Sequence, residues 1–220
     1  MKQKQLSKQT GKSEPKRLTL LGVEFVYLYL LGIVLAFLGW VVENTAKAVT
    51  QGVIDARFHV LPFIFSYSLI VFAFHLLLGS PDSVAFFGKK LFPKESKKTK
   101  IASNLIVLVI IFATVFLSEL LIGNLWDLCF GVKLWNYSDM PFHVTQYAGL
   151  IPTVGYGTGA YLLFRFVYAP ALRFVRKKVG YKVAKWIVCT LGVLIFLDEL
   201  ALIVQIVFFH QAHMLWRITF

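Results

Sequence analysis

The chain has 220 residues, of which 58% are hydrophobic and only 15% are charged. This composition is too apolar for a soluble domain of that size and indicates an integral membrane protein. The formal net charge is +12, but the lysines and arginines occur in runs between apolar segments. We therefore attribute them to orientation in the membrane and expect no nucleic-acid partner.

Five apolar segments are long enough to cross a bilayer, which takes about 20 helical residues. They are Leu18–Val42, Val60–Leu78, Ile101–Leu121, Tyr147–Tyr168 and Ile187–Phe209. The predicted fold class is all-α: a polytopic membrane helical bundle with about five transmembrane helices, spanning residues 18–220. Residues 1–17 are polar and rich in lysine, and we predict a disordered cytoplasmic tail there.

Lysine and arginine residues divide unequally between the segments that connect the spans. Six precede the first span, six lie in the second loop and six in the fourth, against four in the first loop, the third loop and the C-terminal segment together. Basic residues remain on the cytoplasmic side of a membrane. The charges therefore predict a plasma-membrane protein with its N-terminus cytoplasmic and its C-terminus outside.

A polar and aromatic stretch, LWNYSDMPFHV at Leu134–Val144, separates the third and fourth spans. Trp135 and Tyr137 are typical of the aromatic belt at the headgroup level, a role that requires no further function. Ser138 and Asp139 before a Met-Pro pair favour a turn. The pattern predicts a tight aromatic turn at the outer membrane edge.

Three sequence elements resemble those of the bacterial CmpB-like membrane proteins, a family classed as ABC-transporter permeases of type IV. Gly39, Trp40 and Glu43 match its Gly-Trp pair and acidic residue at the end of the first helix, and Glu119 matches an acidic residue of a middle helix. The third element is the aromatic turn, matched at Trp135, Tyr137, Ser138, Pro141 and Phe142.

The chain departs from the family pattern in two places. Asn136 and His143 stand where the family usually has Asp and Asn, and the segment from Ala56 to Tyr67 lacks the glycines of an Asn-Arg-Gly segment. The resemblance implies a permease that works with a separate ATPase. Fold and family do not by themselves fix chemistry.

Acidic residues near the outer ends of the spans are the first candidates for a site. Glu119 shares a helical stripe with Gly123 and Trp126, and Trp40 and Glu43 are one turn apart. We predict an outward-facing polar vestibule that binds a small substrate or ion and is formed by Glu43, Glu119, Asp127, Asn136, Tyr137 and His143. The alternative is structural: the same side chains hydrogen-bond the turn's backbone and lock the helices together.

Asp198 and Glu199, about halfway along the last span, are the second candidates. A carboxylate at a helix centre costs about 2.5 to 3.5 kcal/mol on insertion scales. Adjacent carboxylates in lipid tend to keep one proton, which suits proton coupling or cation binding. Equally, one of them can accept hydrogen bonds from a neighbouring helix or a partner subunit.

The fourth span contains signals for packing. Gly155 and Gly159 form a small-residue pair that predicts close helix approach, and Pro152 predicts a kink. His59, His75 and His143 fit no metal-ligand spacing, and Cys129 and Cys189 form no CxxC pattern, so we expect no metal and no cofactor.

These observations predict a permease-like transport component associated with the lipid bilayer, with a separate ATPase or other membrane subunit, or with further copies of itself. Two alternatives remain open. One is a membrane enzyme acting on a lipid or isoprenoid headgroup, with Glu119 or His143 as general acid or base. The other is a membrane scaffold without a substrate.

Overall fold

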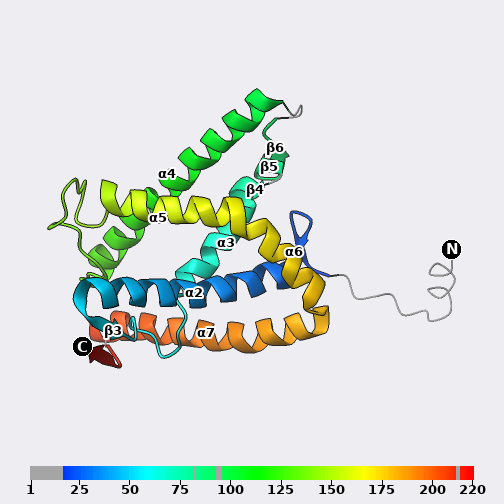
Figure 1. Ribbon diagram of the computed structural model, residues 1–220. Coiled ribbons are helices and arrows are strands. Elements are labelled where there is room, and N and C mark those ends of the chain that lie inside the picture. Colours follow the sequence, from blue (N-terminus) through cyan, green and yellow to red (C-terminus); the bar gives the residue numbers. More distant parts are fainter. Residues whose placement is uncertain (1–16, 82, 93–95, 212–213) are drawn as a thin grey trace.

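The computed structural model describes residues 17–81, 83–92, 96–211 and 214–220. The predicted disordered tail, residues 1–17, therefore lies outside the described residues except at Arg17. Long helices dominate the described chain, and short strand pairs join them (Figure 1). The helices are α2 (Phe25–Gln51), α3 (Phe65–Leu78), α4 (Lys97–Phe130), α5 (Leu150–Leu162), α6 (Ala169–Lys178) and α7 (Tyr181–Phe209), with a π-helix, η1 (Leu163–Tyr168), between α5 and α6.

Three of the described helices, α2, α4 and α7, are long and apolar enough to cross a membrane. They correspond to the first, third and fifth predicted spans. The second span corresponds to α3, which is apolar but has 14 residues. At 1.5 Å per residue such a helix is about 21 Å long, shorter than a typical hydrocarbon core.

The fourth predicted span is continued by α6 but is interrupted by η1. Figure 1 shows the chain bending away from the axis of α5 as it enters α6. A π-helical turn is a known cause of such bends. Pro152 lies in the first turn of α5, where a helix tolerates proline, so the kink that we predicted at this residue is not where the chain bends.

Several predicted helix ends were wrong because local hydrogen bonding, not apolarity, determines where a helix begins. Residues 18–24 were assigned to the first span but form a hairpin of β1 (Thr19–Leu20) and β2 (Val23–Glu24). Glu24 ends this hairpin and pairs with Arg17 at 3.1 Å and Arg176 at 3.0 Å. The start of α4 lies at Lys97, where Ser96 and Thr99 form a capping box.

The other strands connect segments at the two ends of the molecule. At one end, β3 (Val53–Asp55) pairs antiparallel with β7 (Arg217–Thr219), which holds the C-terminal segment beside the end of α2. At the other end, β4 (Gly79–Ser80), β5 (Ser83–Phe86) and β6 (Lys89–Lys90) form a small sheet between α3 and α4. Figure 1 places the hairpin of β1 and β2 at that second end too.

The core lies around α2, which packs against α3, α6 and α7, while α4 packs against α5. Its buried residues include Leu28, Leu78 and Phe164. His75 is a structural residue of this core: its ring nitrogens lie 2.8 Å from the hydroxyl of Tyr168 and 2.8 Å from the carbonyl of Leu20.

Close packing inside helices occurs at Gly39, Gly123, Gly157 and Gly192, of which only Gly157 lies in the fourth span. A Cβ on Gly39 would lie 2.5 Å from the ring of Tyr67, and one on Gly123 would lie 2.4 Å from Tyr147. In α5 the close contact is made by Gly157, against Phe112. Among the described residues nothing lies within 4 Å of a Cβ at Gly155 or Gly159, so the close approach predicted for that pair does not occur within this chain.

Candidate functional site: an outer polar cluster and an aromatic cavity

Ion pairs tie the loop after α2 back onto the last turns of that helix. Asp55 is buried, pairs with Lys47 and accepts a hydrogen bond from the backbone N–H of Arg57 at 3.0 Å. The side chain of Asn44 accepts the N–H of Asp55 at 2.8 Å. Arg57 in turn pairs with Glu43. This arrangement places a guanidinium beside the carboxylate that the sequence had marked as a site residue.

The backbone of the loop is strained where it passes Glu43. Arg57 and Phe58 both adopt positive φ, 54° and 68°, a conformation that suits glycine and costs other residues about 1 to 2 kcal/mol each. The ion pairs around Asp55 and Glu43 hold the loop in this conformation.

The aromatic turn between α4 and α5 is fixed to one stripe of α4. The hydroxyl of Tyr137 donates to Glu119 Oε1 at 3.0 Å, Tyr147 packs on Gly123, and Gln146 Nε2 donates to Asp127 Oδ2 at 3.1 Å. The indole N–H of Trp135 donates to the carbonyl of Tyr147 at 3.0 Å. Positions 119, 123 and 127 of the helix thus each contact one residue of the turn.

Side chains from four segments approach one another near this turn. Tyr67 on α3 donates its hydroxyl to Glu43 Oε1 at 3.0 Å. Tyr156 on α5 interacts electrostatically with Glu43 and Glu119, and Tyr137 interacts with both carboxylates too. We call this group the outer cluster; its members are Glu43, Arg57, Tyr67, Glu119, Tyr137 and Tyr156.

Glu119 is the carboxylate of the cluster with unused hydrogen-bonding capacity; Arg57 Nε is likewise buried without a hydrogen-bond partner among the described residues. Its Oε1 accepts from Tyr137, whereas Oε2 is buried and has no hydrogen-bond partner among the described residues. Burial and the neighbouring Glu119 carboxylate raise the pKa of the Tyr137 hydroxyl above its usual value. Tyr137 therefore remains a protonated donor, and Oε2 remains open to a further donor.

The other three predicted vestibule residues bond within or beside the turn. Asp127 holds Gln146, and Asn136 accepts the backbone N–H of Ser138 at 2.8 Å. His143 is exposed, and its Nδ1 lies 2.9 Å from the carbonyl of Met140. Of the six predicted residues, Glu43, Glu119 and Tyr137 thus lie in the outer cluster, while these three stabilise the turn.

The remaining motif residues shape the backbone of the turn. Ser138 and Pro141 are exposed. Phe142 adopts a φ of 59°, and its carbonyl accepts the N–H of Leu150 at 3.0 Å where α5 begins. The motif therefore positions the start of α5.

Asp198 on α7 binds the loop after β3. Its two oxygens accept the backbone N–H groups of Val60, at 2.8 Å, and Leu61, at 3.0 Å. His59 Nδ1 lies 3.7 Å from Asp198 Oδ2 and 4.0 Å from Glu199 Oε2. Burial lowers the pKa of His59, although Asp198 acts in the opposite direction. Asp198 therefore acts as a hydrogen-bond acceptor for the loop. The sequence had left this kind of role open beside proton coupling or cation binding.

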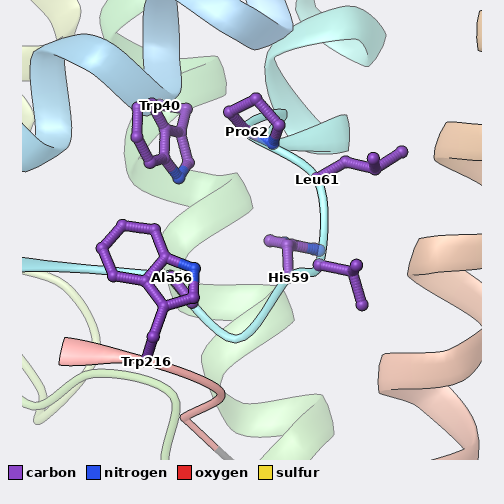
Figure 2. Close-up of a pocket in the computed structure, with 7 residues that line it drawn as sticks. Trp40, Ala56, His59, Leu61, Pro62 and Trp216 are labelled. Carbon is purple, nitrogen blue, oxygen red and sulfur yellow. The ribbon is translucent and has the colours of Figure 1, made fainter.

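A cavity of about 190 Å³ lies beside the outer cluster (Figure 2). It is lined by Trp40, Ala56, His59, Val60, Leu61, Pro62 and Trp216. The rings of Trp40 and Trp216 stand 6.3 Å apart at an angle of 61°. The cavity thus joins the family's Gly-Trp element to the C-terminal segment.

Sequence reasoning missed several residues that complete these sites. Arg57, Tyr67 and Tyr156 belong to the outer cluster, and His59 and Trp216 line the cavity. Arg57 could have been found because it is a basic residue in a loop that is otherwise poor in positive charge. No spacing in the sequence links Trp216 to Trp40, because the pairing of β3 with β7 brings them together.

Comparison with curated proteins and with solved structures finds no significant match. Residues 30–203 match the profile of a family described as "Putative ABC-transporter type IV". The matched stretch holds the Gly39–Glu43 element, Glu119 and the aromatic turn that now form or border the outer cluster. Since this match covers most of the chain, the protein belongs to that ABC-transporter type IV family.

Proposed function

We propose that this chain is the membrane subunit of a transport-type complex in the plasma membrane. In this arrangement α3 and the continuous run α5–η1–α6 add two crossings to those of α2, α4 and α7. The N-terminus is then cytoplasmic and the C-terminus is outside. The separation of basic residues between alternate connecting segments supports this orientation.

We further propose that the outer cluster binds a small cationic substrate. The observation that carries this proposal is the buried Glu119 Oε2, which has no partner among the described residues. Glu43 already pairs with Arg57 and Tyr67, so Glu119 is the carboxylate available to a cation.

The test uses methylammonium as a probe on the purified full-length protein. Methylammonium chloride should raise the thermal stability of the wild type above that in NaCl of equal ionic strength, because a ligand that binds the folded state stabilises it. Glu119→Gln should remove this difference. Asp139→Asn is the matched control: it deletes one negative charge from an exposed position of the same turn and should leave the difference intact.

A response that persists in Glu119→Gln would overturn the outer cluster as the cation site. The same result follows if wild type and Asp139→Asn show no difference between the two salts. Once a transported cation is known, Glu119→Gln should also abolish its uptake while expression and folding persist.

The family assignment supports a separate ATPase as partner. We propose that this subunit docks at the end of the molecule that carries β4, β5, β6 and the last turn of α6, because the orientation above places that end in the cytoplasm. Purification in a mild detergent should then recover an ATPase subunit with the chain. Recovery that is unchanged after deletion of residues 83–92 would contradict this location.

A scaffold is the second candidate, favoured by one observation. The side chains of Trp135, Asn136 and Asp127 all bind backbone or side-chain atoms of the turn itself. A scaffold predicts that Trp135→Phe, which removes the indole donor, releases a co-purifying protein and leaves any cation response unchanged. The enzyme hypothesis gains no such support, since His143 is exposed and bound to the carbonyl of Met140.

A further inference from the structure

The cavity between Trp40 and Trp216 lies outside the outer cluster and has its own chemistry. Its walls are mainly apolar, with two indole rings, the imidazole of His59 and the side chains of Val60, Leu61 and Pro62. A space of about 190 Å³ accommodates a compact molecule of a few heavy atoms. The lining therefore selects for an apolar body.

One polar atom among these walls is unsatisfied. Trp40 Nε1 is buried and has no hydrogen-bond partner among the described residues. Figure 2 shows this nitrogen on the edge of its ring that faces Trp216 and His59. A buried donor without an acceptor is unfavourable, and a ligand that supplies an oxygen would satisfy it.

Two of the carboxylates near the cavity are already paired. Glu43, one turn from Trp40, bonds Arg57 and Tyr67, and Asp198 accepts two backbone N–H groups. No aspartate, glutamate, lysine or arginine is among the described residues that line the cavity, so an ion entering it would lose its hydration without a charged partner in the walls. This lining favours a neutral ligand.

The loop that forms one wall is held in a strained conformation. Arg57 and Phe58, between the lining residues Ala56 and His59, both have positive φ. Strained backbone persists where surrounding contacts over-determine it, and such segments cluster at ligand sites. Here the contacts are the ion pairs of Asp55 and Glu43 and the hydrogen bonds from the backbone N–H groups of Val60 and Leu61 to Asp198.

We propose that this cavity binds a small neutral molecule whose apolar body packs against the cavity walls, the two indole rings included, and whose carbonyl-type oxygen accepts a hydrogen bond from Trp40 Nε1. Two sources supply this chemistry at a membrane surface. One is a soluble solute, and the other is the ester carbonyl of a phospholipid. The experiment below separates them.

Cyclohexanone and methylenecyclohexane form a matched pair of probes, since they have nearly the same shape but only the ketone carries an acceptor. The full-length protein is placed in nanodiscs, and binding is followed by the saturable change in tryptophan fluorescence, with empty nanodiscs as the partition control. The alkene is the more hydrophobic probe, so the hydrogen bond is measured by the change in each probe's affinity when the indole N–H is removed, and not by the ratio of the two affinities in wild type.

Two variants assign the hydrogen bond to its atom. Trp40→Phe keeps an aromatic wall but removes the N–H, so the ketone should bind about tenfold more weakly than to wild type while the affinity for the alkene is unchanged, and Trp216 still reports occupancy. Trp216→Phe should weaken both probes by a similar factor. The Trp126→Phe control, at a residue that does not line the cavity, should behave as wild type.

A Trp40→Phe variant that weakens the two probes by the same factor, or that weakens neither, would overturn the proposed hydrogen bond from the indole. If neither probe gives a saturable change, the cavity is not a ligand site. None of these readouts depends on Glu119, so their failure is distinct from failure of the proposed cation site.

Lipid chemistry then identifies the source of the natural ligand. Nanodiscs made of ether-linked phosphatidylcholine contain no ester carbonyl. If a lipid ester normally occupies the cavity, it competes with the ketone, so the ketone should bind more tightly in the ether-linked nanodiscs than in ester-linked ones. If the natural ligand is a soluble solute, the ketone should bind equally well in both.

Discussion

Asp198 holds the outer loop against α7 through both carboxylate oxygens, which accept the backbone N–H groups of Val60 and Leu61. Asp198→Asn replaces one acceptor by an N–H₂ donor that faces a backbone donor. We expect a loss of about 1 to 3 kcal/mol in unfolding free energy, the usual cost of a buried unsatisfied group. Thermal unfolding of the protein in detergent measures this loss.

Glu199→Gln provides the matched control for this prediction. Glu199 is the neighbouring carboxylate on the same helix and lies 4.0 Å from His59, beyond hydrogen-bonding distance. Its substitution should lower the melting temperature less than Asp198→Asn. If both variants lower the melting temperature equally, the negative charge of Asp198, and not its hydrogen bonds to the loop, contributes the stability.

Because His59 is buried, we expect the free energy of unfolding to depend on pH. Burial lowers its pKa in the folded protein, whereas in the unfolded chain the pKa is about 6.5. Between these two values the unfolded chain binds more protons, so the stability from His59 is present above about pH 6.5 and is lost as the pH falls below it. Melting temperatures recorded from pH 7.5 to 5 should show this loss.

The substitution His59→Gln should flatten that profile, because glutamine does not titrate in this range. His143→Gln serves as the control, since His143 is exposed and its removal should leave the profile as in wild type. A wild-type profile that His59→Gln leaves unchanged would assign the pH dependence to another group.

The sequence revealed half of the outer cluster. Glu43 and Glu119 were found because acidic residues are rare in apolar segments and therefore stand out in the sequence. Their partners were not visible, because tyrosines such as Tyr67 and Tyr156 are ordinary in a membrane segment. Arg57 acquires its role only through the fold of the loop that brings it back to Glu43.

At the scale of helices, some glycines lie directly against another side chain, whereas others have open space around them. Gly123→Ala places a methyl group 2.4 Å from Tyr147, the residue whose carbonyl holds Trp135. Since real contacts are never so short, the turn must shift, and we expect a loss of about 1 to 3 kcal/mol. Thermal unfolding and exposure of Trp135 to an aqueous fluorescence quencher both report the shift.

Gly155→Ala is the comparison, because nothing among the described residues lies within 4 Å of its Cβ position. It should be neutral or stabilise the helix by up to about 1 kcal/mol. A destabilising Gly155→Ala would show that a second chain packs on this face of α5.

The helices illustrate what apolarity can and cannot predict. The apolar segments located the interiors of α2, α3, α4, α5 and α7, because burial in lipid requires long apolar stretches. They missed α6, which lies in the segment that we predicted as the fourth loop. The ends of the helices depend on local chemistry: Gly52, with a φ of 63°, ends α2, and the capping box at Ser96 begins α4. The π-helical turn η1 forms the end of the fourth predicted span, and Pro170 follows it at the start of α6, so the signal for this bend was a proline that we did not use.

At the scale of the whole molecule, the structure collects the sites at one end. The aromatic turn, the outer cluster, the cavity and the C-terminal strand β7 adjoin the end of α2. The hairpin of β1 and β2, the β4–β6 sheet and the basic last turn of α6 lie at the other end, as Figure 1 shows. In the orientation that we propose, a bilayer lies between these ends and the basic end faces the cytoplasm.

Cysteine labelling tests this orientation. Both native cysteines, Cys129 and Cys189, are free and are first replaced by serine. In that background Ser138→Cys, in the aromatic turn, should react with a membrane-impermeant maleimide on intact cells. Lys178→Cys, at the end of α6, should react only after the membrane is permeabilised, because basic residues are retained on the cytoplasmic side.

Both positions are exposed in the structure, so a difference in labelling reflects the side of the membrane and not burial. The reverse pattern would place the outer cluster and the cavity in the cytoplasm, where an ATPase would compete for the same surface as a substrate. Labelling of both cysteines on intact cells would put an even number of crossings between α4 and α7. Since the aromatic turn and α6 are joined by one continuous helical run, that result would require α5 and α6 to return to the outer surface at the bend formed by η1.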